Sequence, residues 1–127
     1  MKKLLSTLIL IGTLAVSMGA DRPWKSKYVL LTVTAYCPNS CCCGDSADGI
    51  TATGRNAYRP GVAVDPEIIP LGAHLDIPIY GDMRGWWTLA DDVGGRVKGN
   101  TIDVRMKTHE EAVQWGRKRL RVRVWSR

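Results

Sequence analysis

Six short segments rich in β-branched and aromatic residues, separated by turn residues, constrain the fold of this chain most strongly. These segments are residues 28–36, 61–64, 75–79, 86–90, 101–105 and 120–124. Their length and composition are typical of β-strands. In the clearest of them, Ile102 and Val104 face one side of the strand and Asp103 faces the other. Six strands in a short chain predict a mainly β fold that closes into a small barrel, because closure removes exposed strand edges.

One short helix is predicted before the last strand. Thr108 and Glu111 have the spacing of a capping box, and Gly116 ends the helix. Residues 21–27 are predicted to be a loose arm. Residues 37–59 are dense in Cys, Gly, Asp, Ser and Asn, which predicts a loop. A loop of that length is usually functional or cross-linked.

Residues 1–20 have the features of a secretory signal peptide: two lysines, then an apolar stretch, then small residues. An uncleaved N-terminal anchor is the alternative, although the apolar run is short for a membrane span. No stable membrane span is expected after cleavage. The remaining part, about 107 residues, suffices for one small domain, predicted at 28–127. The protein is therefore predicted to be secreted or to lie in the cell envelope.

The chain is basic, with a formal net charge of +6, to which Lys2 and Lys3 contribute two charges. Much of the excess lies at residues 117–127. A basic balance favours polyanionic partners. For an exported chain those partners are the cell wall or the membrane surface, so nucleic acid is not expected as a partner. A solvated strand face is the alternative interpretation of the same charges.

Four cysteines lie close together in the predicted loop, at Cys37, Cys41, Cys42 and Cys43. An even count in an exported chain predicts disulfides, although four cysteines allow three pairings and the sequence does not choose among them. A soft metal such as zinc, or free thiols, are the alternatives. The cluster has no second pair of ligands nearby, and both histidines, His74 and His109, are distant in sequence. Neither a metal nor a cofactor is therefore expected.

Three aspartates, Asp65, Asp92 and Asp103, lie in apolar or glycine-rich surroundings. Burying a carboxylate is costly, so such a residue within an apolar run indicates a function. Three of them brought together by a small β fold would form an acidic site, the kind that cleaves glycosidic bonds. A role in turns is the alternative for Asp65 and Asp92. Asp91 faces away from Asp92 in an extended strand and is expected to be a solvated neighbour.

Several separated stretches resemble the three-aspartate (3D) domain family. They are residues 34–37, 49–54, 62–72, 90–104 and 112–117, and they agree with the family in order and spacing. This domain is shared with the C-terminal part of the membrane-bound lytic transglycosylase A family and with stationary-phase survival proteins of Firmicutes. The resemblance covers nearly all of the chain after the predicted signal peptide.

The resemblance implies a six-stranded double-psi β barrel. It also implies a lytic transglycosylase that cleaves the β-1,4 bond between N-acetylmuramic acid and N-acetylglucosamine in peptidoglycan and leaves 1,6-anhydro ends. Asp65, Asp92 and Asp103 match the three family aspartates, and Asp103 matches the general acid and base. A non-catalytic module of the same fold that binds cell-wall polysaccharide is the alternative. The oligomeric state is not predicted.

Substrate contacts are expected from residues near the matched motifs: Thr34, Tyr36, Gly94, Gly95 and Lys98. The sequence departs from the family pattern at two places. Arg96, Val97 and Lys98 replace the usual Ala-Ile-Lys, and Trp86 and Trp87 stand where smaller residues are expected. These departures concern the contacts with substrate more than the acid itself.

Overall fold

The computed structural model describes residues 22–78 and 88–127. The predicted signal peptide at 1–20, the predicted turn at 80–85 and the tryptophans Trp86 and Trp87 lie outside the described residues.

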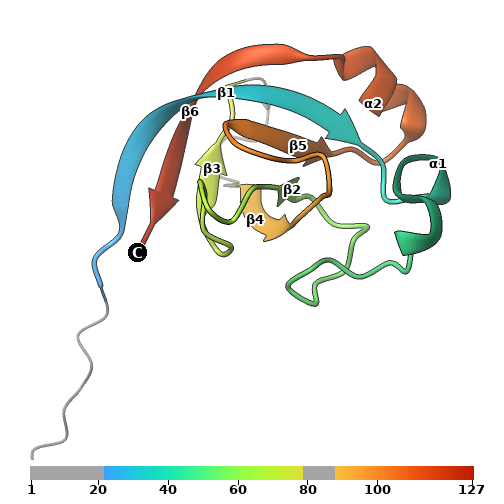
Figure 1. The fold of residues 1–127 in the computed structure, drawn as a ribbon, viewed down its shortest axis with the longest axis horizontal. Coiled ribbons are helices and arrows are strands. Elements are labelled where there is room, and N and C mark those ends of the chain that lie inside the picture. The colour runs from blue at the N-terminus through green and yellow to red at the C-terminus, as the bar shows by residue number, and fades with distance from the viewer. Residues whose placement is uncertain (1–21, 79–87) are drawn as a thin grey trace, which may run out of the picture.

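Six strands form a closed barrel in the order β1-β5-β2-β4-β3-β6 (Figure 1). Their bounds are β1 Lys25–Tyr36, β2 Val62–Ala63, β3 His74–Asp76, β4 Thr88–Asp92, β5 Thr101–Arg105 and β6 Lys118–Ser126. Strand β5 lies between β1 and β2, and β4 lies between β2 and β3. The pairs β1–β5 and β2–β4 are parallel, while the other pairs are antiparallel. The predicted mainly β fold and six-stranded barrel are confirmed, and strands inserted between sequence neighbours are what a double-psi barrel requires.

The two long strands β1 and β6 form the largest part of the barrel wall. They pair antiparallel from Lys25 opposite Ser126 to Val33 opposite Lys118. In Figure 1 they arch together over the short strands. The prediction of a loose arm over 21–27 was wrong for its last three residues, because the C-terminal end of β6 supplies them with a partner strand.

The core consists of aliphatic side chains that point into the barrel. Ile102 and Val104 of β5 are fully buried, as the alternating pattern predicts, and so are Val122 and Val124 of β6. The core also contains Leu31, Val33, Val62, Val64, Ile69, Ala73, Leu75, Ile77 and Ala90. Each large aliphatic side chain in this set contributes about 1.5–3 kcal/mol to stability through removal from water.

Helix α2, His109–Trp115, is the helix that the sequence predicts. The Thr108 hydroxyl accepts a hydrogen bond from the Glu111 backbone N–H at 3.2 Å, while the Glu111 carboxylate accepts one from the Lys107 N–H. At Gly116 the backbone adopts a φ of 70°, which favours glycine and ends the helix. The Trp115 indole N–H donates to the Val33 carbonyl at 3.2 Å and so docks α2 against β1.

A second short helix lies in the segment predicted to be a loop. Helix α1 spans Ser40–Cys43, and the 3-10 turn η1, Gly44–Ser46, follows it directly. The prediction of a single helix was therefore incomplete. A one-turn helix without a side-chain cap or a buried face leaves no periodic pattern in a sequence. Among the described residues, no helix combines the length and apolar character needed to cross a bilayer.

A buried ion pair links β4 to β5 beneath the loop between β1 and β2. The Asp91 carboxylate accepts hydrogen bonds from Arg105 Nη1 at 3.0 Å and Nη2 at 2.8 Å. The side chains of Asp91 and Arg105 are 0% and 2% exposed. Arg55 approaches the same carboxylate from the side, at 3.0 Å. Gly61 is required beside the pair, because a Cβ atom there would collide with both partners.

The expectation of a solvated Asp91 was therefore wrong. The register between β2 and β4 shifts, so that Val62 lies opposite Ala90 and Ala63 lies opposite Asp92. Asp91 is the extra residue of this irregularity. Bulges of this kind redirect side chains and are frequent beside functional sites. Here the shift leaves Asp91 buried against Arg105 while Asp92 lines the pocket described below.

Replacing Asp91 with Asn is expected to cost about 3–5 kcal/mol of unfolding free energy, because it leaves the buried Arg105 charge uncompensated. Urea unfolding at pH 7 measures this loss. Asp45→Asn, at an exposed carboxylate, is the control and is expected to stay within about 0.5 kcal/mol of wild type. A loss below about 1 kcal/mol in Asp91→Asn would contradict a structural role for the pair.

Candidate functional site

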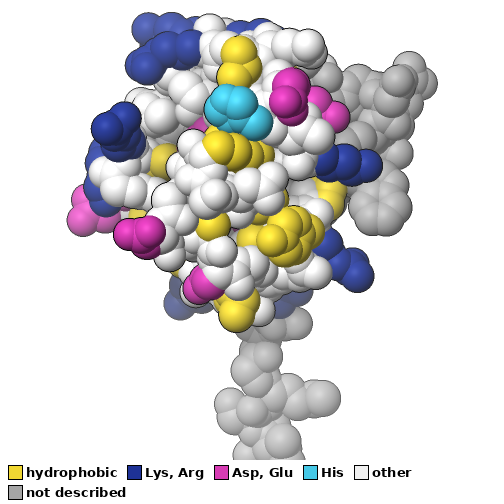
Figure 2. Space-filling model, turned by 90° about the vertical axis from the view of Figure 1, so that its right-hand side faces the viewer, with side chains coloured by type: hydrophobic (Ala, Val, Ile, Leu, Met, Phe, Trp, Pro, Cys, Tyr) yellow, Lys and Arg dark blue, Asp and Glu magenta, His cyan; other side chains and the backbone are white. Residues whose placement is uncertain are grey.

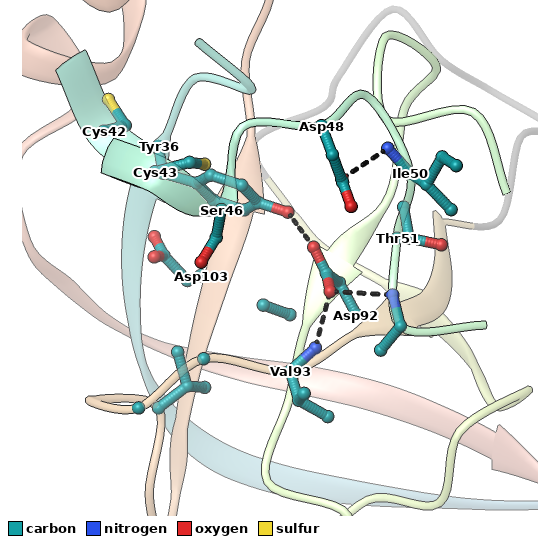
Figure 3. A pocket seen from close by; sticks show the side chains of 15 residues that line it. Tyr36, Cys42, Cys43, Ser46, Asp48, Ile50, Thr51, Asp92, Val93 and Asp103 are labelled. Carbon is teal, nitrogen blue, oxygen red and sulfur yellow. Dashed lines mark hydrogen bonds between the residues drawn. The ribbon is translucent and has the colours of Figure 1, made fainter. Parts of the chain in front are cut away.

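An open pocket of about 550 Å³ lies at the end of the barrel where β1, β4 and β5 meet the cysteine-rich loop (Figure 3). It is lined by Tyr36, Cys42, Cys43, Ser46, Asp48, Ile50, Thr51, Ala52, Ala63, Asp92, Val93, Gly94, Gly95, Val97 and Asp103. Two of the three predicted catalytic aspartates, Asp92 and Asp103, are thus brought into one cavity. In Figure 3 they approach it from different strands, with Cys42, Cys43 and Ser46 along one edge.

Asp103 projects from the face of β5 opposite to the buried Ile102 and Val104. Its register partner on β1 is Thr34, whose hydroxyl donates to the Asp103 carboxylate at 3.0 Å. Burial raises the pKa of Asp103 above its ordinary value, and the Thr34 hydrogen bond offsets part of that rise. A half-buried carboxyl with a raised pKa keeps its proton to higher pH than an exposed aspartate does.

Asp92 has a different environment on the same pocket. Its carboxylate accepts hydrogen bonds from the Tyr36 hydroxyl at 3.0 Å and from the backbone N–H groups of Ala52 at 3.1 Å and Val93 at 2.9 Å. Arg105 Nη1 lies 3.9 Å from it. Three donors from three segments hold this carboxylate in a fixed orientation toward the cavity.

Tyr36 connects the pocket to the buried ion pair. Its hydroxyl accepts from Arg105 Nη1 at 3.0 Å and donates to Asp92. Burial raises the pKa of Tyr36 well above its ordinary value, against the lowering effect of Arg105. The phenol therefore stays protonated and remains a donor to Asp92 across the physiological pH range.

Asp65, the third predicted catalytic aspartate, is not among the residues that line the pocket. Its carboxylate accepts hydrogen bonds from the backbone N–H groups of Gly99 at 2.8 Å and Glu67 at 3.1 Å. These hydrogen bonds, that of Gly99 foremost, lower the pKa of Asp65. In the structure Asp65 ties the turn after β2 to the turn before β5, and its catalytic role stays a prediction.

Some of the residues predicted to contact substrate line the pocket, and others do not. Tyr36, Gly94 and Gly95 line the pocket. Thr34 lies behind Asp103, to which it donates, and is not among the lining residues. Lys98 is exposed beside Asp65 and outside the pocket.

One wall of the pocket consists of residues that the strand and aspartate patterns did not single out. They are Ser46, Asp48, Ile50, Thr51 and Ala52, all from the loop between β1 and β2. The stretch 49–54, which resembles the family, is the signal that points to this wall. The hydrogen bond from the Ala52 N–H to Asp92 shows how the loop completes the site.

The cysteines lie next to this wall, and all four are free, so the predicted disulfides are not seen. The Sγ atoms of Cys37, Cys41 and Cys42 and a ring nitrogen of His109 all lie within 4.8 Å of one another. No sequence pattern connects His109 with the cysteines, because 67 positions separate it from Cys42. Helix α2 brings it there.

The fold and the pocket define a small closed β barrel in which Asp92 and Asp103 have unlike environments in one open cavity. Residues 61–126 match the 3D domain, and the chain belongs to this family. The family predicted from the sequence is thereby confirmed.

Three relatives come from Bacillus subtilis (strain 168). The chain is 36% identical over 114 residues to the cell wall-binding protein YocH, covering 87% of this chain and 37% of the relative. It is 33% identical over 99 residues to the putative cell wall shaping protein YabE, covering 77% of this chain and 23% of YabE. It is 36% identical over 101 residues to YorM, an uncharacterized protein derived from the SPbeta prophage, covering 77% of this chain and 41% of YorM. The chain thus spans well under half the length of each relative.

Among solved structures, the chain resembles MltA from E. coli with a TM-score of 0.44 and 29% sequence identity. That similarity covers 61% of this chain and 27% of MltA.

Replacing Asp103 with Asn is expected to raise stability at neutral pH. Because the folded state raises the pKa of Asp103, ionisation of this group opposes folding. The penalty is absent below the unfolded pKa of about 3.9 and grows as the pH rises through the folded pKa. Urea unfolding should therefore show Asp103→Asn to be more stable than wild type at pH 7, with the difference vanishing near pH 3. A stability difference that does not change with pH would contradict this assignment; Asp45→Asn serves as the control.

Proposed function

We propose that this chain binds the glycan strands of bacterial peptidoglycan in the pocket that contains Asp92 and Asp103. The observation that carries the proposal is the open cavity with the oriented carboxylates of Asp92 and Asp103, together with hydroxyl and backbone groups along its wall. Such groups are the hydrogen-bond partners that sugar hydroxyls require. The names of two relatives, a cell wall-binding protein and a putative cell wall shaping protein, support the same ligand.

The basic strand β6 supports attachment to an anionic wall. Its cations lie over aromatic rings: Lys118 over Trp115 at 4.1 Å, and Arg121 over Tyr28 at 4.6 Å. Stacking of this kind orders long side chains on the outside of the barrel while their charges stay exposed. A basic outer face attracts acidic wall polymers over a longer range than the pocket does.

Filling the pocket is expected to weaken binding to purified peptidoglycan at least tenfold, a loss of about 1.4 kcal/mol. Gly95→Trp is the suitable change, because a Cβ atom at Gly95 meets nothing within 4 Å and the added indole projects from the pocket lining. Co-sedimentation of the full chain with purified peptidoglycan measures the affinity.

Gln114→Trp is the matched control, since it adds the same side chain at an exposed position on α2 outside the pocket. It is expected to bind as the wild type does. Equal binding by wild type and Gly95→Trp would place glycan recognition on another surface.

A second candidate function is cleavage of the bound strand by lytic transglycosylation, and the environment of Asp103 favours it. A general acid must hold its proton near the working pH, and burial raises the pKa of Asp103 in that direction. Asp92, oriented by three donors, would face the positive charge that develops on the sugar ring.

The reaction needs one carboxyl group and no bound water. Protonated Asp103 donates its proton to the glycosidic oxygen as the bond from C1 of N-acetylmuramic acid to that oxygen breaks. The C6 hydroxyl of the same muramic acid then forms a new bond to C1, and the Asp103 carboxylate accepts the hydroxyl proton. The products are an N-acetylglucosamine hydroxyl and a 1,6-anhydro end, and the acid is regenerated.

Under this candidate, Asp103→Asn is expected to abolish the release of anhydro-muropeptides, because an amide N–H is too weakly acidic to protonate the glycosidic oxygen. Mass spectrometry of digested peptidoglycan detects these products. Asp48→Asn, at another carboxylate of the same pocket, should retain them. Cleavage by wild type should decline as the pH rises through the pKa of Asp103, since only the protonated form acts.

Thr34→Val tests whether the pKa of Asp103 sets this pH dependence. It removes the hydrogen bond that lowers the pKa of Asp103, so the decline should move to higher pH. Anhydro products from Asp103→Asn would refute the acid assignment. Wall binding without any product from wild type would leave binding alone as the function.

A further inference from the structure

We propose that Cys37, Cys41, Cys42 and His109 form a structural zinc site that joins the end of β1 and α1 to the start of α2. The ligands of this site are distinct from Asp92 and Asp103, although Cys42 also lines the pocket. The site gives the cysteine cluster a role beyond the proposed binding of glycan.

The distances between the donor atoms fit one shared ion. Cys37 Sγ lies 3.1 Å from Cys41 Sγ and 3.0 Å from Cys42 Sγ, and Cys42 Sγ lies 3.5 Å from His109 Nδ1. A tetrahedron with zinc–sulfur bonds of about 2.3 Å has edges of about 3.8 Å. The sulfur–nitrogen distance is close to that edge, and the two sulfur–sulfur distances need to lengthen by about 0.7 and 0.8 Å to admit the ion.

The donor set is also the one that zinc prefers. Three thiolates and one imidazole make a Cys₃His site, and Cys37 and Cys41 have the spacing of a zinc-ligand pair, with three residues between them. Four protein ligands fill a tetrahedral coordination sphere and leave no position for water or substrate. Such closed sites are structural rather than catalytic.

The four ligands come from three parts of the fold that a metal ion would hold together. Cys37 directly follows β1 and is fully buried, Cys41 and Cys42 lie on α1, and His109 is the first residue of α2. The face that bears α1 and α2 is shown in Figure 2, where a histidine lies beside side chains of the colour class that includes cysteine. Helix α1 has no buried residue and no side-chain cap, so it has little packing of its own to hold it.

A metal ion at this point would fix α1 to α2, and α2 is docked on β1 through Trp115. Cys42 and Cys43 line the pocket next to the wall that the loop between β1 and β2 forms. The zinc site would therefore hold one wall of the glycan pocket in place.

The fourth cysteine provides a built-in control. Cys43 Sγ donates to the Cys37 carbonyl at 3.3 Å and lines the pocket, and it is not part of the group of four converging ligands. The other histidine, His74, lies on β3 with its ring centroid 5.1 Å from that of Trp24.

A disulfide between Cys37 and either Cys41 or Cys42 is the competing outcome. It requires a sulfur–sulfur distance of about 2.05 Å and uses two cysteines without any part for His109. Only zinc binding requires the imidazole, so replacement of His109 distinguishes a zinc site from a disulfide.

The test is metal analysis of the full chain, purified under reducing conditions with added zinc sulfate and then desalted. Wild type and Cys43→Ser are expected to retain one zinc ion per chain. Cys37→Ser and His109→Ala should bind zinc at least tenfold more weakly in competition with a chelator. Removing the metal from wild type should lower the thermal midpoint, and the same chelator should not lower that of metal-free His109→Ala.

A thiol count with a chromogenic disulfide completes the test. With zinc bound, Cys43 should be the only rapidly reactive thiol, and four should react after chelation. Two outcomes would overturn the proposal: wild type without zinc, whether it contains four free thiols or a disulfide, or unchanged zinc affinity in His109→Ala. Neither outcome bears on the proposed glycan binding, which the Gly95→Trp comparison tests separately.

Discussion

The Asp91–Arg105 ion pair is the interaction on which the rest of the site depends. Removal of two charges from water is costly, and close bidentate contacts offset that cost. The pair links β4 to β5 across the intervening β2, and these two strands carry Asp92 and Asp103. Arg105 also donates to the Tyr36 hydroxyl, which in turn donates to Asp92. A continuous chain of polar contacts thus leads from the buried ion pair to the pocket.

Asp92 and Asp103 show how one fold gives the same residue type different chemical properties. Asp103 is half-buried, accepts a side-chain hydrogen bond from Thr34 and has a raised pKa. Asp92 accepts three hydrogen bonds and lies near the Arg105 guanidinium. Unlike environments for two carboxylates are the usual basis for separate acid and stabilising roles. Glycan binding requires only the shape and donors of the pocket, whereas cleavage requires this difference as well.

The cysteine-rich loop is the least regular part of the barrel and also forms a wall of its pocket. One-turn helices such as α1 have little intrinsic stability and depend on tertiary contacts or cross-links. The convergence of three thiols and an imidazole beside this wall gives the loop a means of attachment. Order in the loop and the shape of the pocket are therefore coupled.

The sequence alone determined the barrel, the buried faces of β5 and β6, the capped helix α2 and the family, because these follow from local periodicity, capping residues and ordered motifs. It did not determine the burial of Asp91, since a register shift between β2 and β4 breaks the alternation of side chains. Nor did it determine that Asp92 and Asp103 share a pocket from which Asp65 is absent, or that His109 meets the cysteines. These features are contacts between segments distant in the chain, and only the closure of the barrel brings such segments together.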